Sequence, residues 1–540
     1  MPRWIDPASA GLVAALALAC AAQAQAQVGG APLSSNDWLS GRVTQPPATP
    51  PGTSWRPGQP VPPDALRRAP QPAADPRPVA KTGAVAPVGV TRLSDGNPDA
   101  KGTLSATAAG LPPDLWGDAT ADAVAQALAA YDPRLPATRQ ALLRLLTAQL
   151  APPAGSADGA EGQLFLARLD RLIALGQLPA ARALAQAAGA GNADIVRRSF
   201  DVALITGDEG ALCETIGHRP GLSPGFGARI YCLAQAGDWP AAALTLHGAQ
   251  AGGLIPDPTA ALLRDFLDDG AVDAADGADI APPAPAAVTP LDFRLHEAIG
   301  QPLATTDLAL GFAHADLRPN GGWKARVEAA ERLARAGALD PATLAQAYGE
   351  QAPAASGGVW DRARAWQDLD RALVADDAAA TGDALTRAAR LFADARLTPT
   401  LAAMVAARLP SGMTPEAQAI AARLRLVAGL PVTGSDGSDM DRWLSALAHS
   451  TDAPPPPPPG APPAAAAYAA ALAPPQGDAP APSSRGLEMI AALADVDAGV
   501  AGDQARTAAG LARLVALGQA PLARQAAVEL LLPDAASPRP

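Results

Sequence analysis

The stretch RLIALGQLPAAR, residues 171–182, decides the fold of this 540-residue chain. It recurs as RLVALGQAPLAR at residues 513–524, and a related unit, CLAQAGDWPAA, occupies residues 232–242. In each copy a proline lies three residues after a glycine, which is Gly176, Gly518 or Gly237. Glycine adopts the left-handed conformation just past a helix end, and proline suits the first turn of a helix, where its missing N–H costs nothing. Each copy therefore predicts two helices that fold back on each other through a short turn.

The segment before Gly176 has the spacing of an amphipathic helix. Its apolar side chains share one face, whereas Arg168, Asp170 and Arg171 lie elsewhere. The apolar set is Phe165, Leu166, Leu169, Leu172 and Ile173. Gly207 begins a further turn, so the turn glycines 176, 207 and 237 are separated by 31 and 30 residues. A repeat of this length predicts an α-solenoid, because each hairpin can bury its apolar stripe only against its neighbours.

These hairpins resemble the tetratricopeptide family of solenoids over roughly residues 160–270, 320–350 and 500–530. The period is shorter than the family's repeat of about 34 residues, and Tyr231 and Trp239 stand in for some of its aromatic anchors. The resemblance implies a scaffold of helical hairpins whose concave face binds peptides or proteins.

A second resemblance is to exported alphaproteobacterial proteins that carry the label "antifreeze glycopeptide polyprotein". It rests on residues 237–239, GDW, with the alanines that follow, and on residues 356–361, SGGVWD. Antifreeze glycopeptides need tandem Ala-Ala-Thr, which occurs here once, at residues 379–381. Ice binding by that route is therefore not expected.

Composition favours helices over strands. The chain is 49% hydrophobic but only 4% aromatic, and much of the hydrophobic content is alanine, the best helix former. The formal charge of −12 and the pI near 4.9 argue against a nucleic-acid partner, since phosphate binding needs a concentrated basic surface. The predicted fold class is all-α, a right-handed α-solenoid of helical hairpins with long disordered segments rich in proline and alanine.

The first residues have the order of a secretory signal peptide. Arg3 precedes an apolar run at residues 10–22, which is too short to cross a membrane as a helix, and small residues follow it. Cleavage is expected near Ala24 or Ala26, which would make the mature protein periplasmic or secreted, without a transmembrane segment. The alternative is lipid attachment at Cys20, although the spacing of Leu18 from this cysteine is unusual for a lipoprotein signal.

Proline-rich breaks divide the rest of the chain. We expect a signal peptide at 1–26, a disordered tail at 27–114, a repeat block at 115–270, a linker at 271–289, a second helical block at 290–449, a proline-rich linker at 450–485, and a C-terminal helical pair at 486–532.

Two cysteines are left once the signal peptide is removed. Cys213 and Cys232 lie 19 positions apart on two neighbouring predicted helices. An exported chain with an even cysteine count favours a disulfide between them. The alternative is two small buried side chains that never meet.

The sequence offers no catalytic, cofactor or metal site. Residues 221–225, GLSPG, match the pattern of a nucleophile elbow, but Pro224 has no N–H to donate to an oxyanion, so we interpret the segment as a turn between helices. His218 lies five residues from Cys213, yet no third group orients such a pair. The histidines are scattered, without the spacing of a helical zinc site, at His218, His247, His296, His314 and His449.

Four tryptophans have different expected roles. Trp38 and Trp55, within the proline-rich tail, form a possible docking motif, because an aromatic side chain supplies a large apolar contact to a partner's pocket. The alternative is transient packing on the chain's own helices. Trp116 is expected to strap the tail onto the first helices, and Trp366 is expected in the core because it lies on an apolar stripe.

These features predict a non-enzymatic scaffold of the cell envelope that binds one or more unidentified envelope proteins and needs no cofactor. The alternative is an enzyme, or an enzyme accessory, that acts on cell-wall polymer through a carboxylate pair which the sequence does not reveal.

Overall fold

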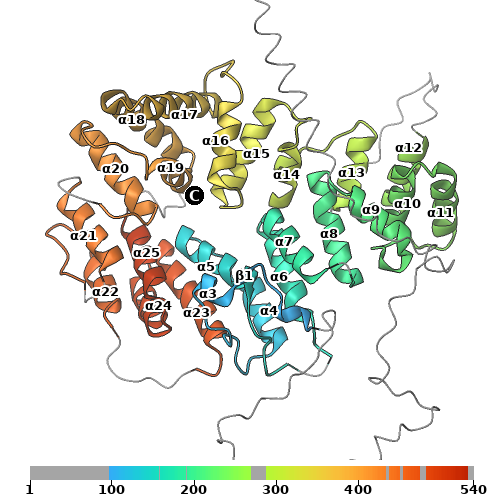
Figure 1. Ribbon diagram of the computed structural model, residues 1–540, viewed down its shortest axis with the longest axis horizontal. Coiled ribbons are helices and arrows are strands. Elements are labelled where there is room, and N and C mark those ends of the chain that lie inside the picture. Colours follow the sequence, from blue (N-terminus) through green and yellow to red (C-terminus); the bar gives the residue numbers. More distant parts are fainter. Residues whose placement is uncertain are drawn as a thin grey trace, which may run out of the picture. The chain divides into compact units, whose positions relative to one another are not determined.

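The computed structural model describes residues 96–156, 159–189, 191–268, 288–432, 437–450, 454–474 and 482–532 (Figure 1). All of them fall within one unit of the chain, Thr91–Pro540. The described part is mostly helical, with 23 α-helices and two strands of two residues each, so the all-α prediction is confirmed. The signal-peptide residues, Trp38 and Trp55 lie outside the described residues.

The first elements combine helices with one small parallel sheet. Leu104 pairs with Ala148 and Ser105 with Gln149. The elements are η2 (Pro98–Ala100), β1 (Leu104–Ser105), α3 (Ala106–Ala109), α4 (Ala121–Ala130), α5 (Pro136–Thr147), β2 (Ala148–Gln149), α6 (Gln163–Ala174) and α7 (Leu178–Ala188).

The chain continues through helices that contact their neighbours in sequence. They are α8 (Ala193–Thr206), α9 (Gly210–His218), η3 (Pro220–Leu222), α10 (Phe226–Gln235), α11 (Trp239–Ala251), α12 (Asp257–Asp268), α13 (Pro290–Ala298), η5 (Thr305–Asp307), η6 (Leu310–Phe312), α14 (Ala313–Asp316), α15 (Trp323–Arg335) and α16 (Pro341–Gly349).

The last part of the described chain also consists of helices. Its elements are α17 (Val359–Val374), α18 (Ala378–Asp394), α19 (Thr398–Val405), α20 (Pro415–Val427), α21 (Asp439–His449), α22 (Ala464–Ala471), α23 (Arg485–Asp497), η7 (Ala498–Ala501), α24 (Gln504–Ala516) and α25 (Ala520–Leu531).

The predicted turns are present. Gly176, Gly237 and Gly518 have φ angles of +71°, +83° and +78°. After Gly176 the N–H of Gln177 donates to the carbonyl of Leu172 at 2.9 Å, which is the bond that closes a helix with a left-handed residue. The helices on either side of each turn, α6 and α7, α10 and α11, α24 and α25, contact each other as hairpins.

Residues 96–114 correct the prediction of a disordered tail as far as residue 114. Asp99 of η2 is buried, and its carboxylate accepts the N–H groups of Gly162 at 3.0 Å and Phe165 at 2.6 Å, so it caps the first turn of α6. This capping partner lies more than 60 residues from the helix it caps, which is why no local pattern reveals it.

Arg168 also departs from the prediction, because it is buried rather than turned to solvent. Its guanidinium donates to the carbonyls of Leu146 at 2.7 Å, Lys101 at 2.8 Å and Ala148 at 2.8 Å. Burial lowers the pKa of Arg168 to about 10. The side chain fastens α6 to the β1–β2 sheet, since backbone carbonyls rather than water satisfy its donors.

The predicted spacer at residues 450–485 contains an ordered helix, so the spacer prediction is wrong for residues 454–474. In α22 the side chain of Tyr468 is only 3% exposed. The indole N–H of Trp443 donates to the carbonyl of Pro455 at 2.9 Å, within the run of prolines. Alanine provides the helix propensity of α22, and the hydrogen bond from Trp443 attaches the run of prolines to α21.

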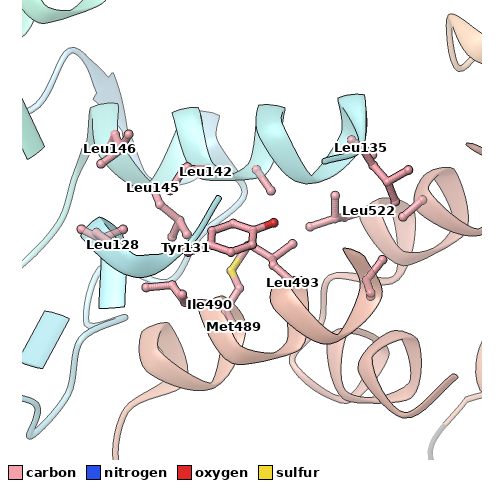
Figure 2. Packing of buried hydrophobic residues seen from close by; sticks show 14 of the residues in the cluster. Leu128, Tyr131, Leu135, Leu142, Leu145, Leu146, Met489, Ile490, Leu493 and Leu522 are labelled. Carbon is pink, nitrogen blue, oxygen red and sulfur yellow. The ribbon is translucent and has the colours of Figure 1, made fainter. Parts of the chain in front are cut away.

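The two ends of the described chain share one hydrophobic core (Figure 2). Leu128, Leu142 and Leu145 of the first helices interdigitate with Ile490 and Leu493 of α23. Accordingly α23 contacts α4 and α5, and α25 contacts α5 and α21. The C-terminal helices are therefore an integral part of the N-terminal core.

Trp116 is buried, as a strap would be, but it also packs on the C-terminal helices. A Cβ atom at Gly486, in the first turn of α23, would lie 2.4 Å from its ring. Only glycine fits there without displacing the indole. Trp366, 5% exposed, lies in the core as predicted.

Candidate binding groove

A groove lies along α18 and α20 and encloses about 620 Å³. Its walls are one face of each helix, because residues three or four apart share a face. The wall from α18 is formed by Asp383, Thr386, Arg387, Ala389, Arg390, Ala393 and Asp394. The wall from α20 is formed by Glu416, Ile420, Arg423, Leu424 and Val427.

Small residues bring the two helices together at one end of the groove. A Cβ atom at Gly382 would lie 3.3 Å from the Cβ of Ala417, and both residues are buried. Each stands near the N-terminal end of its helix. The lining residues extend from this seam toward the C-terminal ends of α18 and α20.

The inner surface of the groove is aliphatic. Ile420 and Val427 are half-buried on α20, Ala393 is exposed on α18, and Leu532 closes the end from the residue after α25. The groove thus depends on the C-terminal helices reaching α20, a contact that the structure contains.

Three arginines border this aliphatic surface. Arg387 lies 3.3 Å from Asp368, and Arg423 lies 3.8 Å from Asp441, with both guanidinium groups more than half exposed. Arg390 is exposed and makes no hydrogen bond or ion pair with another described residue. The Arg387–Asp368 pair is largely exposed, and such pairs contribute about 0–1 kcal/mol, so Arg387, like the unpaired Arg390, can turn to a ligand at little cost.

The predicted cysteine pair is a disulfide. Cys213 of α9 and Cys232 of α10 are bonded at 2.06 Å, with their Cα atoms 5.0 Å apart. They line a second cavity of about 480 Å³ together with Glu214, His218 and Arg229 at its rim. Because the sulfur atoms are bonded to each other, Cys213 offers no thiolate to His218, as the sequence argument anticipates.

The GLSPG segment, residues 221–225, contains the end of η3 and the turn that leads into α10. The hydroxyl of Ser223 donates to the carbonyl of Gly225 at 2.9 Å, and the next helix begins at Phe226. The serine therefore serves the local turn, in agreement with the sequence interpretation.

Buried carboxylates are the polar groups that sequence reasoning missed. Glu331 has no exposed surface, and its oxygens accept from Tyr348 at 2.8 Å and from Arg362 at 2.7 and 2.6 Å. Arg335 adds a fourth donor at 3.0 Å. A carboxylate with all its acceptor sites occupied holds its helices together and has no lone pair free for a substrate.

Two further carboxylates have the same kind of partner. Tyr231 donates to Glu209 at 2.6 Å, and Tyr131 donates to Asp497 at 2.6 Å. Burial raises the pKa of Tyr131 and of Asp497. Three of the chain's four tyrosines thus satisfy a buried acid. A tyrosine on an apolar stripe is the available sequence signal, because its hydroxyl needs a partner when buried.

In the described part of the chain, His, Cys, Asp and Glu form no group of three that could hold a metal ion. Across the same residues, no helix combines the length and apolarity needed to span a bilayer.

Comparison with family models, with curated proteins and with solved structures finds no match for this chain.

Proposed function

We propose that the protein is an exported, non-enzymatic scaffold of the cell envelope, a right-handed α-solenoid that binds other proteins through the groove between α18 and α20. The observation that carries the proposal is the groove itself. It encloses about 620 Å³, its lining is aliphatic, and exposed arginines border it. Such a surface suits a protein ligand, since apolar contact provides affinity and the charged rim provides orientation.

The disulfide supports export. Structural disulfides persist in oxidising compartments such as the bacterial periplasm and are rare in the cytosol. The Cys213–Cys232 bond therefore agrees with the prediction of a signal peptide at residues 1–26.

The buried pair Asp497 and Glu529 does not provide the carboxyl groups that a cell-wall enzyme would need. Glycoside hydrolysis requires two carboxyl groups open to the sugar, one as acid and one as base or nucleophile. Asp497 is 4% exposed and accepts the N–H of Leu135, the N-cap residue of α5. Glu529 is 1% exposed and accepts the N–H of Ala137 in the first turn of α5. These two neighbouring carboxylates stabilise the start of α5 and are not open to a sugar.

Site-specific photocrosslinking in intact cells tests the proposal. A benzophenone side chain replaces Arg390 in the groove or, as the matched control, Arg371 of α17, whose side chain is 73% exposed. We expect position 390 to trap at least one reproducible envelope protein that position 371 does not. Equal labelling from both positions, or none from 390, would contradict protein binding at the groove. Release of peptidoglycan fragments by the purified protein would instead favour the enzyme.

A further inference from the structure

The groove has the dimensions of a short helix. Asp383 and Asp394 are 11 residues apart on α18, as are Glu416 and Val427 on α20. At 1.5 Å per residue each wall is about 16 Å long, or about three helical turns. Helices pack with their axes about 8–10 Å apart, so a third helix can contact both walls at once.

The lining excludes the other common forms of bound peptide. An extended peptide gains its affinity from the free backbone groups of a sheet edge, whereas the walls here are helices that satisfy their backbone groups internally. A strand on this aliphatic surface would leave its own N–H and C=O groups unpaired, at a cost of several kcal/mol. Proline-rich peptides need aromatic grooves, and the lining residues include no aromatic side chain.

The charges along the groove define the polar edges of the ligand. Arg387, Arg390 and Arg423 occupy its middle, while Asp383 and Glu416 stand beside the seam at Gly382. A ligand helix with Glu or Asp flanking its apolar stripe would meet the arginines on both walls. Basic residues at the ends of that helix would meet Asp383 and Glu416 beside the seam and Asp394 at the opposite end of the groove.

We infer that the groove binds an amphipathic α-helix of about three turns from a partner protein, with acidic residues on both sides of its aliphatic stripe. This inference rests on the proposed function and adds the chemistry of the partner. The chain's formal charge of −12 disfavours anionic lipid as the occupant, because the protein as a whole is repelled by a negative surface.

Two synthetic helical peptides of about 14 residues provide the test. Their binding to the full chain is measured by fluorescence anisotropy. Both carry the same leucine stripe, with Glu on its flanks in one and Lys in the other. We expect the Glu peptide to bind and to lose at least tenfold in affinity when Arg387→Glu and Arg390→Glu are combined. The Lys peptide should bind the doubly substituted protein better than the Glu peptide does. Arg197→Glu on α8, an exposed arginine that pairs with Asp194 of its own helix, should change neither affinity.

Several results would overturn the inference. These are no binding of the Glu peptide, equal affinity for both peptides, insensitivity to the charge reversal, or arginine-dependent binding to phosphatidylglycerol vesicles. Circular dichroism checks that the variants remain folded, which we expect because both arginines are exposed. If crosslinks from position 390 fall on a non-helical segment of a partner, the helix inference fails while the scaffold function stands. If position 390 traps no partner, both fail.

Discussion

Turn glycines are needed for two reasons: the backbone has a positive φ, and in some turns a neighbouring side chain leaves no room for a Cβ atom. Substitutions at Gly176 and Gly237 can separate these two effects. Gly176 and Gly237 both have positive φ, which costs a residue with a side chain about 1–2 kcal/mol. A Cβ at Gly176 would also lie 2.9 Å from Leu310, whereas a Cβ at Gly237 would meet open space. We expect Gly237→Ala to lower the free energy of unfolding by about 1 kcal/mol, and Gly176→Ala to lower it by about 1–3 kcal/mol more through overpacking. Urea denaturation measures both, and equal losses would contradict a role for the Leu310 contact.

Glu331 illustrates the cost of breaking a buried ionic cluster. Replacing it with Gln keeps its size but leaves the guanidinium of Arg362 without its carboxylate. We expect Glu331→Gln to destabilise the protein by about 3–5 kcal/mol, because an unpaired charge remains buried. Asp368→Asn is the control, since Arg371 and Arg387, which pair with Asp368, are 73% and 55% exposed, and it should cost less than about 1 kcal/mol. Thermal unfolding compares the two, and similar midpoints would refute the cluster's importance.

Residue-level prediction succeeded where the cause is local. The turn at Gly176 follows from a glycine and a proline, and the pairing of Cys213 with Cys232 follows from cysteine count and spacing. Arg168 and Glu331 were not predicted as buried groups, because a hydrophobic pattern assigns every charge to the solvent. Their partners are supplied by other elements, and only the fold brings those together.

At the scale of the element, α5 is capped by helices near the other end of the chain. Its N-cap residue, Leu135, has no side-chain acceptor. Asp497 accepts the N–H of Leu135 at 3.1 Å, and Glu529 accepts the N–H of Ala137 at 3.0 Å. These acids lie at the end of α23 and in α25, so the first turn of α5 depends on the C-terminal helices.

Glu529 should give this contact a measurable pH dependence. Burial raises its pKa from 4.5 to about 7, opposed by the Ala137 N–H, by Gln525 and by Arg139, and reinforced by Asp497. The folded state therefore binds the proton more tightly than the unfolded state. Its contribution to the free energy of unfolding falls as pH rises from about 4.5 to about 7 and is constant above that range. At about 1.4 kcal/mol per pKa unit, the loss is about 3 kcal/mol.

The measurement compares the protein with Glu529→Gln at pH 5 and pH 8, using urea denaturation at each pH. We expect the stability of the unsubstituted protein, relative to the variant, to fall by about 2.5 kcal/mol between these values. Taking the difference removes other acids whose pKa burial raises, such as Asp201, at about 6, and Asp99. An unchanged difference would mean that Glu529 does not titrate with the folding transition.

Element prediction was accurate for hairpins and poor for proline-rich stretches. The helices around residues 171–182 follow from amphipathic spacing and turn residues. By contrast α22 lies within a predicted spacer, and η2 lies within a predicted tail. The prediction treats proline-rich stretches as unstructured, although proline is well accepted at the first turn of a helix.

At the scale of the whole molecule, the chain closes on itself through its hydrophobic core. Leu128 of α4 and Leu142 of α5 belong to the same cluster as Leu493 of α23 and Leu522 of α25 (Figure 2). Local repeats predict each hairpin but not which distant hairpin will cover its free face. The predicted division at residues 450–485 gives no sign of this closure, because contacts between residues more than 300 positions apart leave no periodic trace in a single sequence.

Because the two ends of the described chain share one core, we expect a substitution in the C-terminal helices to destabilise the N-terminal helices. Leu493→Ala removes a fully buried side chain from the shared core, and Leu344→Ala removes one from the separate cluster around α15–α20. Each should cost about 2–5 kcal/mol. Hydrogen exchange followed by mass spectrometry should show faster exchange in α5, residues 136–147, for Leu493→Ala but not for Leu344→Ala. If exchange in α5 does not respond to Leu493→Ala, then α4 and α5 are stable without the C-terminal helices and the closure carries no stability. Equal acceleration by both substitutions would contradict a specific coupling of α5 to α23 and would mean that the chain unfolds as one unit.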